Sequence, residues 1–252
     1  MAARHVKTIQ PIMALSVPMP VCLMDTPIRL PQNYVAPDWC AEILEEWRME
    51  KQLLAAGTFP TQSVLLQGPS GVGKSTAAMW VAQQLNKPLV TMRLSETIDS
   101  YMGSTGSNIA AALKYTITTG AILLIDEIDC ISADRSAKDK DVGEIWRITN
   151  TFIQGLDDWH SQARRSLIIA TTNMAECIDG AIRRRFELEA EMGFPQHVEI
   201  CKIAGVALPE GLQISHANLR KLIVRAKRQS VLKGVDYALT LLGLTEEFRN
   251  NS

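Results

Sequence analysis

Residues 68–76 read GPSGVGKST, a run whose residue types suit phosphate binding. The spacing fits the pattern G-x-x-x-x-G-K-[ST], in which glycines let backbone N–H groups turn toward phosphate oxygens. In that pattern Lys74 reaches the β- and γ-phosphates of a nucleotide, and the Ser75 hydroxyl binds Mg²⁺. A chance glycine-rich turn is the alternative, and the strand before the run and the helix after it disfavour that. The predicted nucleotide-binding residues are Gly68, Pro69, Ser70, Gly71, Val72, Gly73, Lys74, Ser75 and Thr76.

Two carboxylates end an apolar run in AILLIDEID at residues 121–129. Carboxylates at the end of a buried strand are costly unless they have a partner or a role. We expect Asp126 to hold Mg²⁺ directly or through water, as part of the nucleotide site. Glu127 would orient and deprotonate an attacking water. The alternative is an acidic turn on the surface, which the phosphate-binding run in the same chain disfavours.

Two further polar stretches follow along the chain. The apolar pattern IIATTN at residues 168–173 ends in Asn173, whose amide can donate and accept hydrogen bonds and so fix a water beside a γ-phosphate. The stretch AIRRRFELE at residues 181–189 places three arginines side by side, Arg183, Arg184 and Arg185. By itself the triplet fits a nucleic-acid contact, a solvated charge run or a role at the phosphate site.

Strands and helices alternate in the part of the chain that carries these stretches. We predict strands at 63–67, 88–94, 121–126 and 166–172, with a fifth at 186–192, and helices at 74–86, 105–118 and 142–158. Apolar strands that alternate with helices indicate a parallel sheet covered on both faces. The predicted fold class is therefore α/β.

Different patterns flank this α/β segment. Residues 1–37 are rich in proline, and we expect an extended N-terminal arm. Residues 38–56 have the apolar spacing of one helix, with Asp38 as its N-cap. After Pro195 the strand signal stops and helical periodicity continues. We therefore predict an α/β core over residues 38–194 and a small C-terminal helical lid over residues 195–252.

Composition narrows the class of protein. The 252 residues are 46% apolar, which allows a sizeable core, and the formal net charge is -1. Nucleic-acid-binding proteins usually carry a basic excess, so nucleic acid is not an expected partner. The five cysteines form no CxxC pair, which favours a reducing cytoplasm over a disulfide framework. No stretch reaches the ~18 uninterrupted apolar residues of a membrane span.

Together these stretches resemble the AAA ATPases, the AAA branch of the AAA+ superfamily. The phosphate-binding run, LLIDEID, IIATTN and IDGAIRRRF occur in the order and approximate spacing of that family, over about residues 40–195. The resemblance implies an ATPase that uses ATP and Mg²⁺. It also implies a P-loop NTPase core with a five-stranded parallel sheet, a helical lid, and assembly into a ring that is usually a hexamer.

A narrower resemblance lies in DVGEIWRITNTFIQGLDD at residues 141–158. Followed by the Asn173 strand and the arginine run, it is similar to the small single-ring bacterial and phage AAA ATPases. Some of those are encoded beside a subtilisin-like protease. The narrower resemblance therefore implies a possible separate protease or effector as a partner.

The family resemblance also implies roles for single residues. Asn173 matches the family's sensor-1 position. The D-x-A anchor at residues 179–181 precedes the family's two arginine fingers, which fall on Arg184 and Arg185 and leave Arg183 as a structural residue. A guanidinium offers a planar fork to a phosphoryl group, and such a finger is worth ~10³–10⁵ in rate. The predicted catalytic residues are Glu127, Asn173, Arg184 and Arg185.

A substrate-binding loop is implied by SYMGSTG at residues 100–106. This stretch follows the second predicted strand, where the family places its central pore loop. Tyr101, Met102 and Gly103 fit the family pattern of aromatic, apolar and glycine residues, which grips an extended polypeptide. Packing of Tyr101 in the core is the alternative. The charged run 132–141 fits a second pore-facing loop or a plain solvated loop.

The predicted lid departs from the family pattern. We find no clear equivalent of the family's GxSGAD segment, for which SVLKGVD at residues 230–236 is the nearest candidate. No second-sensor arginine is assigned. By family position, contacts to adenine are expected within residues 30–40 and near His197.

Three functions fit this set of features. The first is an ATP-hydrolysing motor that forms a homo-oligomeric ring and remodels, unfolds or translocates a protein through a central pore. The second is an ATP-switched scaffold, ring or filament, that regulates a partner protein or nucleic-acid complex. The third is a kinase, which shares the phosphate-binding run, but Glu127, Asn173 and the arginine run suit hydrolysis. The near-neutral charge and the YMG stretch favour the motor.

Overall fold

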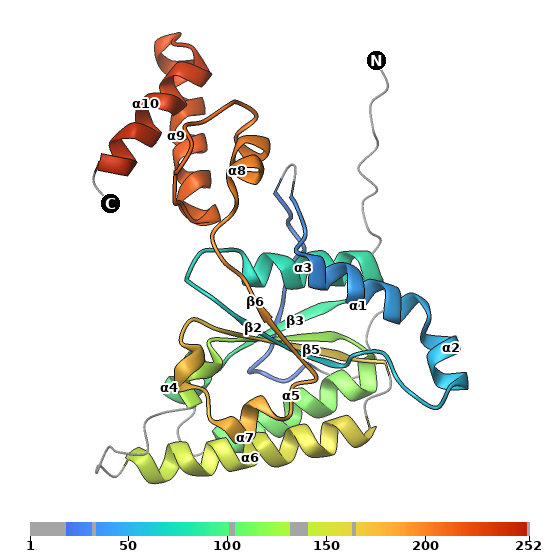
Figure 1. Ribbon diagram of the computed structural model, residues 1–252. Coiled ribbons are helices and arrows are strands. Elements are labelled where there is room, and N and C mark those ends of the chain that lie inside the picture. Colours follow the sequence, from blue (N-terminus) through green and yellow to red (C-terminus); the bar gives the residue numbers. More distant parts are fainter. Residues whose placement is uncertain (1–18, 32–33, 101–103, 132–140, 163–164, 251–252) are drawn as a thin grey trace.

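The computed structural model describes residues 19–31, 34–100, 104–131, 141–162 and 165–250 (Figure 1). Most of the predicted N-terminal arm lies outside these ranges, as do Tyr101, Met102 and Gly103 and most of the charged run 132–141. The roles assigned to those segments therefore stay predictions.

A six-stranded sheet forms the centre of the molecule (Figure 1). Its strands are β1 (Met24–Asp25), β2 (Ser63–Gln67), β3 (Leu89–Arg93), β4 (Ile122–Asp126), β5 (Leu167–Thr172) and β6 (Leu188–Glu191). Their order across the sheet is β1-β3-β4-β5-β2-β6, and only the pairing of β1 with β3 is antiparallel. The predicted α/β class with five parallel strands is confirmed. The edge strand β1 was not predicted, because two residues are too few to display an alternating pattern.

Helices cover both faces of the parallel strands. Figure 1 shows α1 (Asp38–Arg48) and α3 (Lys74–Leu85) on one face, and α5 (Thr105–Thr119) and α6 (Asp141–Gln162) on the other. One hydrophobic cluster joins the strands to α1 and α3 through side chains such as Ile43 and Val81. A second joins them to α5 and α6 through side chains such as Ile109 and Phe152. Burial on both faces explains why β2 to β5 are largely apolar runs in the sequence.

Residues 38–56 form two helices, where the sequence predicted one. Five side chains of α1 are buried, but no side chain of α2 (Glu50–Ala55) is. α1 ends at Arg48, and its C-cap residue Met49 leaves the helical conformation with φ −93° and ψ 13°. α2 begins after it and has no buried side chain that packs in the core. Pro37 occupies the N-cap position, and Asp38 is the first helical residue.

Short elements complete the core. They are α4 (Leu94–Ser100), α7 (Gly180–Arg183) and two 3₁₀ turns, η1 (Ile128–Ile131) and η2 (Ala175–Cys177). Each follows the carboxyl end of a strand: α4 follows β3, η1 follows β4, and η2 and α7 follow β5. They therefore lie in the loops that carry the predicted site residues.

Beyond β6 the described residues form three helices, α8 (His197–Ala204), α9 (His216–Lys233) and α10 (Tyr237–Asn250). They enclose a third hydrophobic cluster of their own, which includes Ile200, Leu219 and Leu241. Figure 1 shows them on the side of the sheet that α3 covers. The predicted helical C-terminal region is confirmed. Among the described residues, no helix has the length and apolar content needed to cross a membrane.

Candidate functional site

The carboxyl ends of three neighbouring strands bring the predicted polar stretches together. β5 lies between β2 and β4, and the three strands are parallel. The register pairs Gln67 of β2 with Thr172 of β5, so the phosphate-binding loop begins beside Asn173. Asp126 ends β4 on the other side of β5. The loop, the acidic pair and Asn173 thus meet at the edge where open α/β sheets bind ligands.

The phosphate-binding loop requires glycine at two positions for steric reasons. Gly68 has a φ of +145°, and a Cβ atom there would lie 2.1 Å from the carbonyl oxygen of Met192. Gly71 has a φ of +79°, and a Cβ atom there would lie 3.1 Å from both Ser215 Oγ and Ala217 Cβ. L side chains rarely adopt such backbone angles. The loop therefore passes close to the end of β6 and to the start of α9.

Lys74 joins the loop to the end of β5. Its side chain is almost buried, at 8% exposure. Nζ donates hydrogen bonds to the carbonyl oxygens of Gly68 at 2.6 Å and Pro69 at 3.0 Å, and to Asn173 Oδ1 at 2.7 Å. Burial lowers the pKa of the Lys74 ammonium, and two nearby carboxylates oppose that shift. Because all three acceptors are neutral oxygens, an anion in the loop would offset the cost of burying this charge.

Thr171 fixes the acidic pair. Its hydroxyl donates to Asp126 Oδ1 and accepts the backbone N–H of Glu127 at 3.3 Å. Thr171 is 1% exposed, so these bonds are made inside the edge of the sheet. Among the described residues, no hydrogen bond reaches Asp126 Oδ2. That oxygen is therefore available to a cation.

Glu127 has an unusual backbone conformation. Its φ of +59° lies in the left-handed region, which costs a residue other than glycine about 1–3 kcal/mol and occurs most often at functional sites. Its Oε2 accepts a hydrogen bond from Ser95 Oγ at 3.1 Å. Ser95 lies at the start of α4, and the sequence analysis assigned it no role. The bond holds the carboxylate toward the β3 side of the sheet edge.

Asp129 holds the turn that presents Asn173. Its Oδ1 accepts from Thr172 Oγ1 at 2.8 Å and from the backbone N–H of Asn173 at 3.3 Å. The sequence analysis gave no role to Asp129 or to the two threonines before Asn173. The second aspartate of IDEID and the pair TT in IIATTN were the available signals.

These groups line a pocket of about 280 Å³. From the core, the lining residues are Ser70, Gly71, Gly73, Lys74, Ser75, Thr76, Asp126, Glu127, Thr171 and Asn173. From outside the core, they are Pro31, Tyr34, Ile203, His216, Ala217 and Arg220. The pocket is therefore formed jointly by the core, by the segment before α1 and by the C-terminal helices.

The start of α9 contacts the phosphate-binding loop. The backbone N–H of Ala217 donates to the carbonyl oxygen of Gly71 at 3.1 Å, and Ser215 Oγ caps the helix by accepting the backbone N–H of Asn218 at 3.2 Å. Residues 230–236, the nearest candidate in the sequence for the family's GxSGAD segment, lie at the other end of α9 and are absent from the pocket lining. A serine before an apolar-periodic run is a helix-start signal that would have indicated Ser215.

Arg220 is a further residue that the sequence analysis did not find. It lies on α9 and lines the pocket, although no arginine of the lid was assigned to the site. Its position follows from the bond between Ala217 and Gly71, which holds the first turns of α9 against the loop.

The two positions expected to contact adenine differ in whether they line the pocket. Pro31 and Tyr34, within residues 30–40, line the pocket. His197 does not line it, and its Nε2 pairs with the carbonyl oxygen of Leu208 at 2.8 Å. His216 does line it, and its Nε2 lies 2.9 Å from Glu199 Oε1. Because a carboxylate only accepts, the Nε2 of His216 carries the hydrogen.

The residues at this edge fit a nucleotide with Mg²⁺. The Ser75 hydroxyl and the Asp126 carboxylate both line the pocket, and Mg²⁺ takes such oxygens together with phosphates and waters. The described residues contain no group of three or more His, Cys, Asp or Glu side chains placed to hold a metal. The N-terminus of α3 adds the positive end of a 12-residue helix.

The match to a family model identifies the family of this chain. The model of the ATPase family associated with various cellular activities (AAA) matches residues 64–194, just over half of the chain. The chain belongs to the AAA ATPase family. The matched range contains every pocket residue that comes from the α/β core. The resemblance inferred from the sequence is thereby confirmed.

Curated AAA relatives are similar over part of their length. The chain is 25% identical over 196 residues to an uncharacterized AAA family ATPase, y4kL, of Sinorhizobium fredii, covering 78% of this chain and 56% of the relative. It is 31% identical over 144 residues to the nuclear valosin-containing protein-like of Mus musculus, covering 55% of this chain and 17% of that protein. It is 31% identical over 185 residues to the ATPase family gene 2 protein of Schizosaccharomyces pombe, covering 71% and 22%. The chain thus spans about half, or less, of these relatives.

A solved structure supports the same fold. The AAA domain of FIGL-1 superposes with a TM-score of 0.67 at 17% identity, covering 90% of this chain and 85% of that one. The coverage includes the C-terminal helices as well as the core, since the core alone is shorter than the matched part. The AAA fold therefore extends beyond the range that the family model matches.

The arginine run of this AAA chain does not line its own pocket. α7 and the residues after it lie near α6, on the other face of the sheet from α3 (Figure 1). The Asp179 side chain caps α7 by accepting the backbone N–H of Ala181 at 2.7 Å, which gives the D-x-A anchor a physical basis. Arg183, Arg184 and Arg185 are all absent from the pocket lining.

Proposed function

We propose that this AAA protein hydrolyses ATP as a ring of identical subunits, a hexamer as is usual in the family. In this proposal the cycle of hydrolysis remodels, unfolds or translocates a polypeptide. Membership of the AAA family supports nucleotide binding, and the fit of the pocket to a phosphate chain supports ATP as the ligand.

The residues of the pocket divide the chemistry between them. The loop N–H groups and Lys74 bind the β- and γ-phosphates. Ser75 and Asp126 hold Mg²⁺, which neutralises phosphate charge when bound. Glu127, oriented by Ser95, accepts a proton from the attacking water. Asn173 sits within hydrogen-bonding distance of Lys74 and orients that water.

One observation carries the proposal of a shared site. Arg184 is exposed and is absent from the pocket lining of its own chain. Phosphoryl transfer gains most from a guanidinium placed against the charge that develops on the γ-phosphate. A second copy of the chain provides a nucleotide for this exposed cation, and a ring satisfies every copy in the same way.

The test is the ATPase rate per subunit as a function of protein concentration, with size-exclusion chromatography on the same samples. The proposal predicts that specific activity rises as subunits assemble, because each site then gains an arginine. A flat profile across the assembly transition would contradict it and would leave Arg220 as the arginine of the site. Assembly and activity without any polypeptide binding would favour the ATP-switched scaffold.

The substrate class and the cellular compartment are inferred from sequence composition and from residues 101–103. Tyr101, Met102 and Gly103 are proposed to contact a polypeptide in the central pore, and a separate protease or effector would act on what the ring releases. The net charge of -1 supports a protein substrate over nucleic acid. All five cysteines are free thiols, which supports a reducing compartment such as the cytoplasm.

A further inference from the structure

The three adjacent arginines are fixed to the molecule in different ways. The segment that carries them is anchored at both ends by buried side chains, Ile182 at 0% exposure and Phe186 at 7%. Between these anchors the backbone cannot move far. The partners of each guanidinium therefore decide which of the three can reach another molecule.

Arg183 is bound to its own sheet. Its Nε donates to Glu189 Oε1 at 3.2 Å, and its Nη2 donates to Glu189 Oε2. Glu189 belongs to β6, so this two-point contact ties α7 to the edge strand of the sheet. Arg183 is therefore used within its own subunit.

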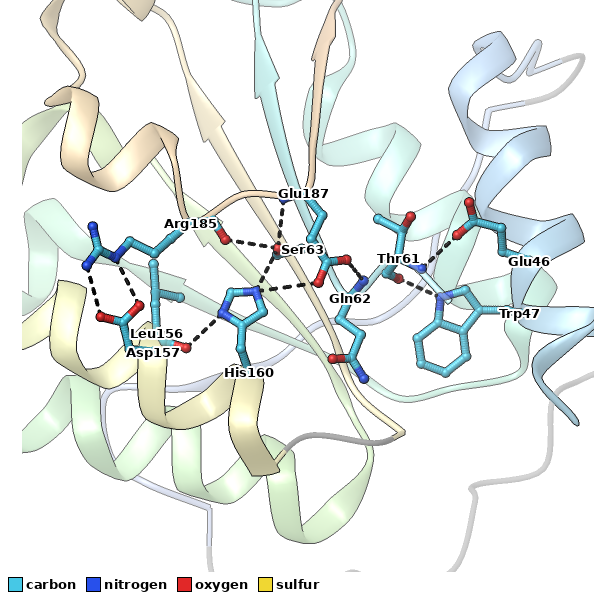
Figure 2. A network of polar contacts seen from close by, with 10 residues as sticks. All are labelled: Glu46, Trp47, Thr61, Gln62, Ser63, Leu156, Asp157, His160, Arg185 and Glu187. Atoms are coloured by element: carbon cyan, nitrogen blue, oxygen red, sulfur yellow. Dashed lines mark hydrogen bonds and ion pairs between the residues drawn. The ribbon is translucent and has the colours of Figure 1, made fainter. Parts of the chain in front are cut away.

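Arg185 is bound still more completely. Its Nε and Nη2 donate to the two carboxylate oxygens of Asp157 at 3.0 and 2.9 Å (Figure 2). Its Nη1 donates to the carbonyl oxygen of Ala181 at 2.9 Å. All three guanidinium nitrogens thus have partners in the same chain. Asp157 lies on α6, so the contact joins the arginine run to the long helix beneath the sheet.

The backbone carbonyl of Arg185 is held by Ser63, the first residue of β2. Ser63 Oγ lies 3.2 Å from the Arg185 carbonyl oxygen and 2.9 Å from His160 Nε2 (Figure 2). His160 Nδ1 donates to the carbonyl oxygen of Leu156 at 2.8 Å, since a carbonyl only accepts. The Glu187 backbone N–H donates to Ser63 Oγ at 3.1 Å. The side chain of Arg185 is therefore held from α6, and its carbonyl oxygen is held from β2 by Ser63, which also contacts His160 of α6.

Arg184 differs from its two neighbours. It is exposed, and among the described residues its guanidinium has no hydrogen bond or ion pair. We propose that Arg184 is the one arginine of the run that enters the nucleotide site of a neighbouring copy, and that Arg185 is a positioning residue, clamped by Asp157 so that Arg184 projects outward. This inference rests on the proposed ring and assigns to Arg185 a different role from that implied by the family resemblance.

The Asp157–Arg185 contact suits positioning better than stability. Asp157 is 53% exposed at its side chain, and ion pairs between exposed groups contribute little to the free energy of unfolding. A displacement of about 1 Å at a reacting centre can nevertheless cost ~10²-fold in rate. Loss of the clamp should therefore lower the rate of hydrolysis while leaving the fold intact.

The competing assignment makes the opposite prediction. If Arg185 itself entered the neighbouring site, Asp157 would compete with the nucleotide for its guanidinium. Removal of Asp157 would then raise the ATPase rate or leave it unchanged. The sign of this single effect separates a positioning role from a direct role in the neighbouring site.

The experiment measures kcat and KM for ATP in the assembled protein for Asp157→Ala, Arg185→Ala, Arg184→Ala and the double variant Asp157→Ala/Arg185→Ala. Asp158→Ala is the matched control, because it removes the exposed carboxylate that follows Asp157 on α6. We expect kcat to fall about 10- to 100-fold for either clamp variant with KM changed less than about twofold. For Arg184→Ala we expect a fall of about 10³-fold or more. Asp158→Ala should match the wild type.

The double variant tests whether Arg185 acts through Asp157. Its kcat should be no lower than that of the worse single variant, because one contact is lost in all three proteins. A kcat for Asp157→Ala equal to or above the wild type, with Arg185→Ala strongly impaired, would overturn the inference. Thermal melts verify folding, and Asp157→Asn, which keeps volume and one acceptor, should be intermediate in kcat. Size-exclusion chromatography distinguishes failure of the proposed ring from failure of the positioning role of Arg185. If wild-type activity does not depend on assembly, the proposed ring is wrong.

Discussion

Gly68 is the residue where the phosphate-binding loop has least space. The loop leaves β2 there and passes the carbonyl oxygen of Met192 at a separation that only a residue without Cβ allows. The glycines of the GPSGVGKST run thus serve two purposes, since the backbone must also turn its N–H groups toward the phosphates.

Gly68→Ala should damage both folding and ligand binding. A Cβ atom 2.1 Å from the Met192 oxygen forces a backbone shift, at a cost of about 1–3 kcal/mol in the free energy of unfolding. The expected result is a lower melting temperature and ATP binding weakened at least about tenfold. Gly193→Ala is the control, because nothing lies within 4 Å of its Cβ position and its φ is not positive. Equal effects of the two changes would refute the steric explanation.

The site residues predicted from the sequence are those whose own side chains would contact the nucleotide, its metal ion or the attacking water. Lys74, Asp126, Glu127 and Asn173 meet at one sheet edge, and their residue types and strand-end positions were visible in the sequence. Ser95, Thr171 and Asp129 were not found, because a hydroxyl or carboxylate that orients another group has no spacing rule of its own. Such residues become visible only when the fold brings distant segments into contact.

At the scale of elements, the cap of α9 links the C-terminal helices to the nucleotide pocket. Ser215 Oγ accepts the backbone N–H of Asn218, and two residues further on Ala217 donates to the Gly71 carbonyl oxygen. The start of α9 and the phosphate-binding loop are therefore expected to move together.

Ser215→Ala should loosen this contact. Loss of an N-cap costs about 1 kcal/mol, so the melting temperature should fall by a few degrees. ATP affinity, measured by calorimetry with the Glu127→Gln variant to prevent turnover, should weaken several-fold, because the first turn of α9 carries pocket residues. Ser230→Ala, near the other end of the same helix, is the control and should leave affinity unchanged. Unchanged affinity in Ser215→Ala would mean that the lid does not contribute through this cap.

The elements themselves were largely predictable because burial imposes a regular pattern. The four strands β2 to β5, buried on both faces, gave largely apolar runs. The boundaries of all five predicted strands agree with the structure to within a few residues. The break between α1 and α2 was not predictable, since Met49 is neither proline nor glycine and α2 lacks buried side chains. The contact of the C-terminal helices with the phosphate-binding loop was not assigned from the sequence, because it rests on one backbone hydrogen bond, from Ala217 to Gly71.

At the scale of the whole molecule, substrate contact is expected at Tyr101. The binding of fluorescein-labelled casein to the ATP-loaded Glu127→Gln assembly provides a direct probe. Tyr101→Ala should weaken that binding at least about tenfold, because it removes the aromatic contact, which is worth roughly 1.5 kcal/mol or more. Tyr101→Phe keeps the ring and should bind like the parent. If the alanine variant binds casein normally, the pore assignment is wrong.

The proposed nucleotide site involves two copies of the chain. The arginine run was recognisable in the sequence, yet its three residues look alike there. They differ in the fold, where Glu189 and Asp157 occupy two of them and Arg184 stays exposed. The central claim is that this arginine completes a site on another copy.

A mixture of two inactive variants tests whether two copies of the chain share one site. Glu127→Gln keeps Arg184 but lacks the base, and Arg184→Ala keeps the base but lacks the arginine. If the site is shared, mixed assemblies contain interfaces with both groups, and ATPase activity should rise well above the sum of the two variants measured separately. If each chain completes its own site, the mixture should give only that sum, and the account would be contradicted.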